Sequence, residues 1–516
     1  MTLSLAQENA LQREQIAQLT ATIEQLKQQL AWFQRQIFGE KSEKRHLIDP
    51  AVQPSLLEGL VSDAKPLDIP TQTIAAHDRK KKSRDGCVTG EGLRFDASVP
   101  VQDVEIVPPE LQGEHADDYE IVRYETTHLL AQRPGSSVIL RERRPVLKRK
   151  SDQSLITPPA PARILDNCMA DVSFLAGLLI DKFLYHLPLY RQHQRLQMSG
   201  IQMARSALTQ QSSRAMALLK PIAEAQFKHV LQSKVLALDE TPIKAGLKGN
   251  GSGKMRQGYF WPLYGDDQEV SFRYHESRSG KHLQQLLNGF SGTLLTDAYG
   301  AYHAYAANKP EITHANCWAH SRRNFEQSLE SEPTAAGEAL QIIGELYRHE
   351  QTIRSNDLNG EAKQTYRSEH SAPVVRLFWT WCEQQCLRQD LTPHSPLAKA
   401  LKYAMARVQE LQVFLSDPDV AIDTNHLERA LRVIPMGRRN WLFCMTEAGA
   451  ADVATIQSLL VTCRLQGVNP YTYLVDVLQR ISQYPNSQIL DLTPRCWKDK
   501  FADNPLRSAV DWQYSG

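Results

Sequence analysis

The stretch "KVLALDETPIKA", residues 234–245, decides the fold class of this chain. Its apolar run "VLAL" is typical of a buried strand, and Asp239 follows the run directly. A second run, "GTLLT" at 292–296, is followed in the same way by Asp297. At strand ends the alternation of side chains breaks, and polar groups can project into a shared cleft. Alone, each aspartate would more often be a turn or helix cap; together they are candidates for one site.

The residues around these two runs predict a mixed-sheet α/β domain. The segment at 258–276 indicates a hairpin that turns at Gly265-Asp266-Asp267. Residues 279–290 are typical of a helix, and 312–327 of a strand that runs into a helix. The expected core therefore spans 229–330 and 419–445, separated by a helical insertion at 331–418 and followed by C-terminal helices at 446–516.

The segment "IDTNHLERALRVIPMGRRNWLF", residues 422–443, predicts a helix. Asn425, Glu428 and Arg432 are three and four residues apart, so they share one face of that helix. Arg429 flanks the same face. Further along, Gly437 is expected to end the helix, and Arg438 and Arg439 continue its basic surface.

These residues together suggest a metal-dependent reaction at a phosphodiester. Two strand-end aspartates and a helical glutamate are what two-metal phosphoryl transfer needs, and Mg²⁺ prefers such hard oxygen ligands. We therefore predict Asp239, Asp297 and Glu428 to be catalytic and to hold two Mg²⁺ ions, for which Mn²⁺ could substitute. Arginines compete for a carboxylate unless a polyanion docks there. An Arg–Glu network that only pins a helix is the alternative. The predicted DNA-binding residues are Lys244, Asn425, Arg429, Arg432, Arg438 and Arg439.

Composition narrows the class of protein further. The chain has 516 residues, a formal charge of +1 and eight cysteines, none in a Cys-x-x-Cys pair, so neither a disulfide scaffold nor a zinc ribbon is expected. The N-terminus lacks the apolar core of a signal peptide, and the longest apolar run, 172–180, is far shorter than the roughly 20 residues of a membrane span. These features predict a cytoplasmic protein with no membrane partner.

The N-terminal region predicts dimerisation. A heptad seam, within a predicted coiled coil at 1–45, favours a parallel two-stranded coil, although a helix packed on its own protein is the alternative. Its a positions are Ile16, Ile23, Leu30 and Ile37, and its d positions are Leu19, Leu26 and Phe33. A linker is expected at 46–86, which contains one basic cluster at 77–84.

Two modules are expected between the linker and the core. Residues 87–160 predict a small β-rich module with a basic cluster at 141–150. Residues 161–228 predict one helix up to about residue 197, a "MSGI" turn and a second helix, which is either a helix-turn-helix reader of DNA or a plain α-hairpin. The segment "HANCWAH" at 314–320 has spacing too cramped for a zinc site and is expected to be a strand-to-helix junction beside the active site.

The chain resembles bacterial transposases of the insertion sequence 66 type, in the DDE superfamily, and its motifs occur in the same order as in that family. The resemblance rests on "FGEKSEK", "KFLYHLPLYRQ", "LDETP", "TDAYGAY", "CWAHSRRNF", "NHLERALR", "GRRNWLF" and "LQGVNPYTYLVDVL". It implies a ribonuclease H-like core with Asp239, Asp297 and Glu428 as the catalytic triad. Cys317 and His320 resemble the Cys-x-x-His motif that many such transposases carry between the second aspartate and the glutamate, and they are candidates for supporting the active site.

One departure from the family concerns zinc. Members usually carry a cysteine-rich zinc module after the linker, whereas this chain has only Cys87 there. We therefore predict no zinc in the 87–160 module, which leaves its role in DNA binding open.

The resemblance implies a transposase that binds the ends of its mobile element. Companion transposition proteins are possible partners. The transposase would cut a strand and join the freed 3′-hydroxyl to target DNA, with Asp239 bridging both metals. Two alternatives stay open: a metal-dependent DNA nuclease without strand transfer, and a catalytically inactive coiled-coil DNA-binding relative.

Overall fold

The computed structural model describes residues 87–88, 93–95, 99–112, 116–133, 135–247, 255–441 and 444–511. The predicted coiled coil and linker, residues 1–86, lie outside these ranges. The chain divides into two units, and the larger comprises Gly86–Gln327 with Ala335–Gly516. Across the described ranges, no helix combines the length and the apolar character needed to cross a membrane.

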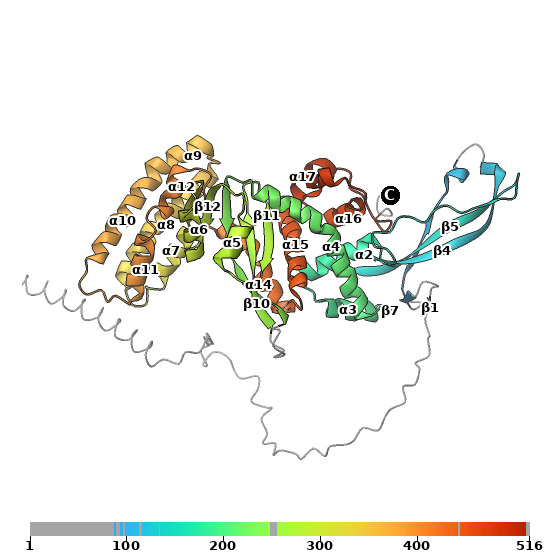
Figure 1. Ribbon diagram of the computed structural model, residues 1–516, viewed down its shortest axis with the longest axis horizontal. Coiled ribbons are helices and arrows are strands. Elements are labelled where there is room, and N and C mark those ends of the chain that lie inside the picture. The colour runs from blue at the N-terminus through green and yellow to red at the C-terminus, as the bar shows by residue number, and fades with distance from the viewer. Residues whose placement is uncertain are drawn as a thin grey trace, which may run out of the picture. The chain divides into compact units, whose positions relative to one another are not determined.

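A six-stranded mixed sheet forms the centre of this unit (Figure 1). Its strand order is β11-β10-β8-β12-β13, with β9 beside β10. Strands β8, β12 and β13 run parallel, whereas β10 is antiparallel to β8, β9 and β11. The predicted mixed α/β class and the predicted β10–β11 hairpin are therefore confirmed. The strands are β8 (Val235–Leu238), β9 (Thr241–Leu247), β10 (Met255–Tyr264), β11 (Val270–His275), β12 (Gly292–Thr296) and β13 (Ile312–Asn316).

Helices cover both faces of the sheet. In β8, Val235 and Ala237 belong to one hydrophobic core, and Leu236 and Leu238 belong to a second. Successive side chains of a strand point to opposite faces, so a strand buried on both sides is apolar throughout. The first core includes residues of α4 (Arg205–Val230) and α15 (Glu447–Leu465), and the second includes residues of α5 (Gly280–Leu286) and α6 (Gly300–Ala307).

Strands β8 and β9 follow a single register along β10, with a break between them. Leu238 pairs with Leu263 and Thr241 with Phe260, so the same register sets Asp239 opposite Pro262. Proline has no N–H to donate to a sheet ladder. The ladder is interrupted at this position, so Asp239 lies in the break between β8 and β9.

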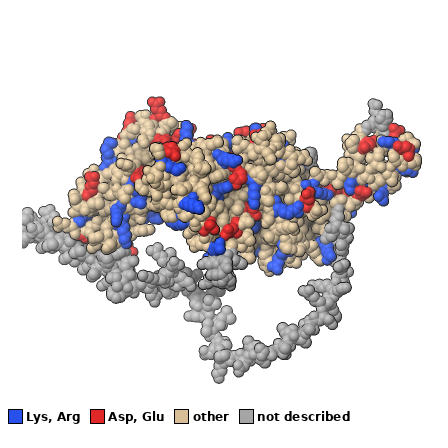
Figure 2. All heavy atoms as spheres, viewed as in Figure 1, with Lys and Arg blue, Asp and Glu red and all other residues tan. Residues whose placement is uncertain are grey.

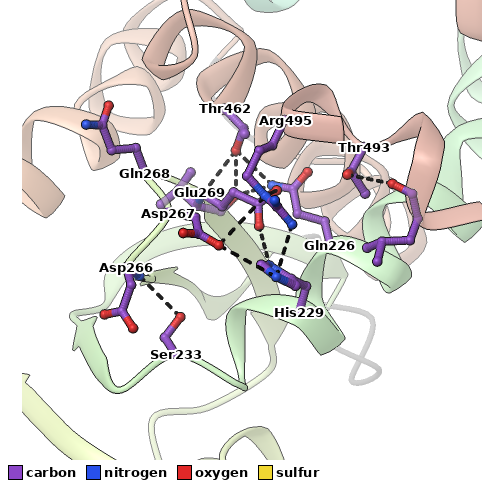
Figure 3. Close-up of polar contacts among 12 residues, drawn as sticks. Gln226, His229, Ser233, Asp266, Asp267, Gln268, Glu269, Thr462, Thr493 and Arg495 are labelled. Carbon is purple, nitrogen blue, oxygen red and sulfur yellow. Dashed lines mark hydrogen bonds and ion pairs between the residues drawn. The ribbon is translucent and has the colours of Figure 1, made fainter. Parts of the chain in front are cut away.

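Side chains of α15 accept hydrogen bonds from the backbone of the edge strand β11. Figure 3 shows one of these side chains, Thr462. The Val270 N–H donates to Thr462 Oγ1 at 3.1 Å, and the Phe272 N–H donates to Ser458 Oγ at 2.8 Å. From α4, Gln226 Nε2 donates to the same Thr462 oxygen at 2.8 Å. Because an exposed edge strand carries unpaired backbone groups, this helix satisfies donors that would otherwise need water or another strand.

Next to this edge, Figure 3 shows a charged network that joins α4 to the C-terminal helices. The carboxylate of Glu269 is buried, and it contacts His229 Nδ1 at 2.6 Å and Arg495 Nε at 3.6 Å. Burial raises the pKa of Glu269, and its contacts with His229 and Arg495 oppose this rise. The C-terminal helices are thus tied to the core by ion pairs as well as by apolar packing. They are α16 (Pro470–Arg480), η5 (Asn486–Leu492) and α17 (Pro494–Phe501).

A helical region follows the strand-to-helix junction of β13 and α7 (Trp318–Glu326). Its polar centre is Arg367, which is fully buried and forms a two-bond pair with Glu350. The same guanidinium donates to the carbonyl oxygens of Phe414 and Val420 at 2.7 and 3.0 Å. The elements of this region are α8 (Pro333–Ser355), α9 (Gly360–Tyr366), η3 (Arg367–Ser371), α10 (Ala372–Cys386), α11 (Pro396–Met405), η4 (Glu410–Gln412) and α12 (Val413–Ser416).

Upstream of the core, two long strands form a hairpin, β4 (Tyr119–Arg133) and β5 (Ser136–Arg149). The β5 strand also pairs with β3 (Val101–Glu105) and β6 (Leu155–Ile156), while β1 (Cys87–Val88), β2 (Arg94–Phe95) and β7 (Ile201–Gln202) form a separate small sheet.

The single helix predicted before the "MSGI" turn is wrong. The structure has two helices there, α2 (Val172–Phe183) and α3 (Leu189–Met198). Proline disfavours helical geometry in the residue before it, and Pro188 stands directly ahead of α3. His186, inside the break, has a left-handed φ of 55°.

The predicted end of the Glu428 helix at Gly437 is also wrong. The helix α13 (Asn425–Leu431) stops before Arg432, and α14 (Val433–Trp441) continues past Gly437. Pro435 cannot donate the hydrogen bond that a continuous helix would require, but it is tolerated in the first turn of α14. The break therefore precedes the proline and does not occur at the glycine.

Candidate active site

The two predicted aspartates lie at matching ends of neighbouring parallel strands. Asp239 follows β8, and Asp297 follows β12. Leu295 pairs with Ala237, so extending that register by two residues sets Asp297 beside Asp239. The carboxyl ends of parallel strands are where α/β sheets place ligand-binding groups.

Backbone amides hold one oxygen of each aspartate. Asp239 Oδ1 accepts the N–H of Glu240 at 2.7 Å, and Asp297 Oδ1 accepts the N–H of Tyr299 at 2.8 Å. Among the described residues, no hydrogen bond uses Oδ2 of either carboxylate. Each aspartate therefore has a fixed orientation and a second oxygen available to a ligand.

Glu428 reaches the same region from α13. The turn before this helix is ordered by Asp423, whose Oδ1 accepts the Asn425 N–H at 3.0 Å. Glu428 and Asp239 line one open cavity of about 540 Å³. The cavity is also lined by His320, Arg323, Asn425, Arg429, Leu431, Arg432 and Pro435.

The electrostatics of the cavity are those of crowded carboxylates. The pKa of Asp239 is raised to about 7, chiefly by burial and further by the negative charges of Asp297, Glu240 and Glu428. The hydrogen bond from the Glu240 amide opposes this rise. Like charges held together in a poorly solvated place favour a proton or a cation.

Two side chains of α7, Arg323 and His320, lie near the Glu428 carboxylate without a short contact to it. Arg323 Nη2 is 3.8 Å and His320 Nε2 is 3.9 Å from Glu428 Oε1. Burial lowers the pKa of His320, so its ring is neutral near pH 7. Glu428 and Arg432 form no ion pair within 4.0 Å in the described chain. The reading of Glu428 as a helix-pinning partner of Arg432 therefore has no support in the geometry.

The three carboxylates are not gathered to metal-binding distance as the chain stands. Their oxygens do not all lie within 4.8 Å of one another; in the described residues, the three-residue group that satisfies this criterion lies elsewhere, at His303, His314 and Glu410. Asp239 and Glu428 thus face one open cavity, with Asp297 beside Asp239 at the end of the neighbouring strand.

The "HANCWAH" segment does not converge on one point. His314 Nε2 is 2.9 Å from Thr296 Oγ1, behind the strand ends. The buried Cys317 Sγ accepts the N–H and the hydroxyl of Thr424 at 3.3 Å each, which fastens β13 to the start of α13. Burial raises the pKa of this thiol, so it stays neutral. Only His320 reaches the cavity.

The predicted DNA-binding residues line two neighbouring cavities. Asn425, Arg429 and Arg432 line the cavity of Asp239, whereas a second cavity of about 660 Å³ is lined by Lys244, Arg438 and Arg439. Pro435 contributes to both, so the two cavities adjoin. On the face in Figure 2, basic and acidic side chains are interspersed, which agrees with the net charge of +1.

Sequence reasoning missed two members of the site. Glu240, beside Asp239, is bonded by the Tyr302 hydroxyl at 2.5 Å and lies 3.5 Å from Arg278. Arg323 approaches Glu428 from α7. A signal for Arg323 was present, because it is three residues after His320 and so shares its helix face. No local pattern separates Glu240 from Asp239.

Comparison with known proteins agrees with this fold and site. Residues 167–452 match the model of the transposase IS66 family, residues 458–494 match the IS66 C-terminal element, and residues 25–104 match a model described as transposase C of IS166 homeodomain. These matches define the class of protein as a transposase, and the chain belongs to the IS66 family of transposases.

Two curated relatives come from Sinorhizobium fredii. The chain is 30% identical to the uncharacterized protein y4jD over 94% of this chain and 97% of that protein. It is 29% identical to the uncharacterized protein y4qI over 76% of this chain and 74% of that protein.

Proposed function

We propose that this chain is a DNA transposase with a ribonuclease H-like core that binds the ends of its mobile element, cuts DNA and joins the 3′-hydroxyl to target DNA. The observation that carries the proposal is the convergence of Asp239 and Glu428 on one open cavity, with Asp297 beside Asp239 and arginines on the rim. Such a site suits a polyanionic substrate and a reaction at phosphorus.

The donor set fits divalent metal. Burial and three neighbouring carboxylates raise the pKa of Asp239 to about 7, and a cation would relieve that repulsion as a proton does. Mg²⁺, or Mn²⁺ in its place, would be held by Asp239, Asp297 and Glu428. When bound, two such ions supply activation of the attacking oxygen and neutralisation of charge at the phosphate.

The chain's own residues then have separable tasks. Amide hydrogen bonds fix Asp239 and Asp297, so their free oxygens are pre-oriented. Among the described residues, the cation nearest Glu428 is Arg323 at 3.8 Å, so Glu428 can accept another ligand without losing a short ion pair. Arg429 and Arg432 would dock phosphates next to these carboxylates.

A second group of residues extends the DNA path. Lys244, Arg438 and Arg439 line the adjoining cavity, at a place where a duplex leaving the carboxylates could continue. The predicted coiled coil would pair two chains, and companion proteins of the element would complete the assembly.

The test uses the full-length chain and plasmid DNA that carries the ends of its own element. We expect strand cleavage that requires Mg²⁺ or Mn²⁺, and a fall of at least about 10³-fold in Asp239→Asn, Asp297→Asn and Glu428→Gln. The matched control is Glu311→Gln, because Glu311 is an exposed carboxylate at the opposite end of β13. Cleavage that survives the three substitutions would refute the assignment.

A pre-cut end separates transposase from nuclease. We expect the chain to join a DNA end with a free 3′-hydroxyl to target plasmid. Cleavage without joining would identify a nuclease, and DNA binding without either reaction would identify an inactive relative.

A further inference from the structure

A second group of metal-ligand side chains lies away from the carboxylate cavity. His303 on α6, His314 on β13 and Glu410 on η4 each offer one donor atom, and these three atoms lie within 4.8 Å of one another. In the described part of the chain this is the group of three His, Cys, Asp or Glu residues that satisfies that distance. The sheet and the helical insertion therefore meet at a compact His–His–Glu cluster.

The hydrogen bonds around His314 define which ring nitrogen is free. The Thr296 hydroxyl donates to the carbonyl oxygen of Asp297 at 2.8 Å, so its oxygen can only accept from His314 Nε2, 2.9 Å away. Asn316 Nδ2 is also 3.4 Å from this nitrogen, but it has a closer acceptor in the Asp297 carbonyl oxygen at 3.0 Å. The proton is therefore on Nε2, and Nδ1 carries the lone pair.

Among the residues that the structure describes, that lone pair has no hydrogen-bond partner. His314 Nδ1 is buried and forms no hydrogen bond. Burial lowers the pKa of His314 to about 4, so the ring is neutral at physiological pH. A neutral imidazole whose second nitrogen donates to an oxygen is how proteins orient a histidine for metal. A buried acceptor without a hydrogen bond costs free energy of folding unless a ligand binds it.

The other two donors complete a suitable set. His303 Nδ1 and Glu410 Oε1 are 3.6 Å apart. Two ligands of a tetrahedral zinc ion with bonds of about 2.0–2.1 Å are separated by roughly 3.4 Å, so His303 and Glu410 already have nearly the spacing of zinc ligands. The His303 side chain is 69% exposed, which gives an ion a path from solvent. Arg407 is a cationic neighbour of His314. Its guanidinium donates to the Tyr403 carbonyl oxygen and lies over the Tyr403 ring.

The supports of the cluster come from both sides of the junction. On the insertion side, Glu410 begins η4, and the next carbonyl, that of Leu411, accepts the Trp318 indole N–H at 2.7 Å. On the core side, β13 packs against α6 and η4, in the region where Figure 1 shows α6 and α12. Second-sphere contacts of this kind hold ligands in place before the ion arrives.

We propose that His303, His314 and Glu410 bind one Zn²⁺ ion, with water as the fourth ligand, and that the ion fastens the helical insertion to the edge strand β13. Two histidines and a glutamate with one water form a known zinc donor set. The proposal does not depend on the proposed catalytic function, because none of the three ligands lines the carboxylate cavity.

The first experiment replaces zinc by cobalt, whose visible absorption reports four-coordinate geometry. Metal-stripped full-length protein is titrated with Co²⁺ in an Asp239→Asn background, which weakens the carboxylate site. We expect one equivalent to produce intense visible bands, and His303→Ala to remove them. Because His303 is exposed, its loss should not prevent folding.

A matched control uses another close histidine pair. His275 and His282 have ring centroids 5.0 Å apart but do not form part of such a three-ligand group. Co²⁺ bands that persist in His303→Ala and Glu410→Gln, or that fall equally in His282→Ala, would show adventitious binding and overturn the proposal.

A second readout is thermal unfolding. We expect Zn²⁺ to raise the Tm of the wild-type chain and of Asp239→Asn, and not of His303→Ala or Glu410→Gln, since an ion that binds only the folded state stabilises it. Equal Tm shifts in all four proteins would contradict the site. Loss of DNA cleavage in Asp239→Asn with an intact zinc response would show that the two sites are separate.

Discussion

Asp239 and Asp297 occupy matching positions just beyond two adjacent parallel strands, and the charge of Asp297 contributes to the raised pKa of Asp239. The sheet alone therefore brings together two of the three carboxylates proposed as catalytic. The third carboxylate arrives from α13, far along the chain, and the helical region between them is held by its own buried ion pair. The consequences of this construction can be measured.

Stability of the metal-free protein should fall as pH rises because of Asp239. Its folded-state pKa is raised from 3.8 to about 7, so its stabilising contribution is complete below pH 3.8 and is lost as pH rises through about 7. The full effect is at most about 4 kcal/mol. We expect Asp239→Asn to raise the free energy of unfolding at pH 8 and to change it little at pH 4, measured by urea titration in EDTA. An equal effect at both pH values would contradict this origin.

The salt dependence of DNA binding should identify phosphate contacts. We expect Arg432→Ala and Arg438→Ala each to weaken binding and to make the slope of log K against log[salt] less steep by about 1. Fluorescence anisotropy at several salt concentrations measures this. The control is Arg376→Ala, an exposed arginine on α10 outside both cavities. A slope that changes as much in Arg376→Ala would mean that the cavities do not form the DNA path.

Removing Arg367 should unfold the helical insertion. The guanidinium is fully buried and bonds Glu350 and backbone carbonyls, so Arg367→Ala leaves an uncompensated carboxylate at a cost of about 3–5 kcal/mol. Arg388, paired with Asp390 at the surface, is the control, and Arg388→Ala should cost less than about 1 kcal/mol. Chemical denaturation measures both; similar losses would show that the buried pair has no special weight.

The closure of the edge strand should depend on one hydroxyl. Thr462→Val keeps the shape of the side chain but removes the acceptor for the Val270 N–H, so we expect a loss of about 1–3 kcal/mol. Thr455→Val on the same helix is the control, because the Thr455 hydroxyl bonds only the Ala451 carbonyl of its own helix. Faster amide exchange at Val270 in Thr462→Val alone would locate the effect.

The start of the Asp297 strand requires glycine. Gly292 has a φ of 137°, and a Cβ there would lie 2.4 Å from the Lys234 carbonyl oxygen, so Gly292→Ala must move β12 away from β8. We expect it to destabilise the chain and to reduce cleavage, because Asp297 moves with β12. Gly289 also has a positive φ, 84°, but open space around it, so Gly289→Ala should cost only about 1–2 kcal/mol and spare cleavage. Equal activity of the two variants would contradict this role.

The sequence by itself determined the elements of the core. Apolar runs ended by Asp239 and Asp297, the turn at Gly265, and the spacing of Asn425, Glu428 and Arg432 are local patterns, so strand, hairpin and helix face could be read from them. Local rules failed at Pro188 and Pro435, where a proline divided segments that apolar periodicity had joined. Both prolines are themselves local signals, and at these two positions they outweigh the apolar periodicity.

Only the tertiary structure decided which polar groups meet. His314 was grouped with Cys317 and His320 by their spacing, but it lies with His303 and Glu410, because a strand and the following helix turn neighbouring residues to different sides. Arg323 lies 3.8 Å from Glu428, about 100 positions along the chain. Thr462 accepts the Val270 N–H, about 190 positions away. Such contacts follow from the packing of whole elements, and no pattern within a few residues of either partner encodes them.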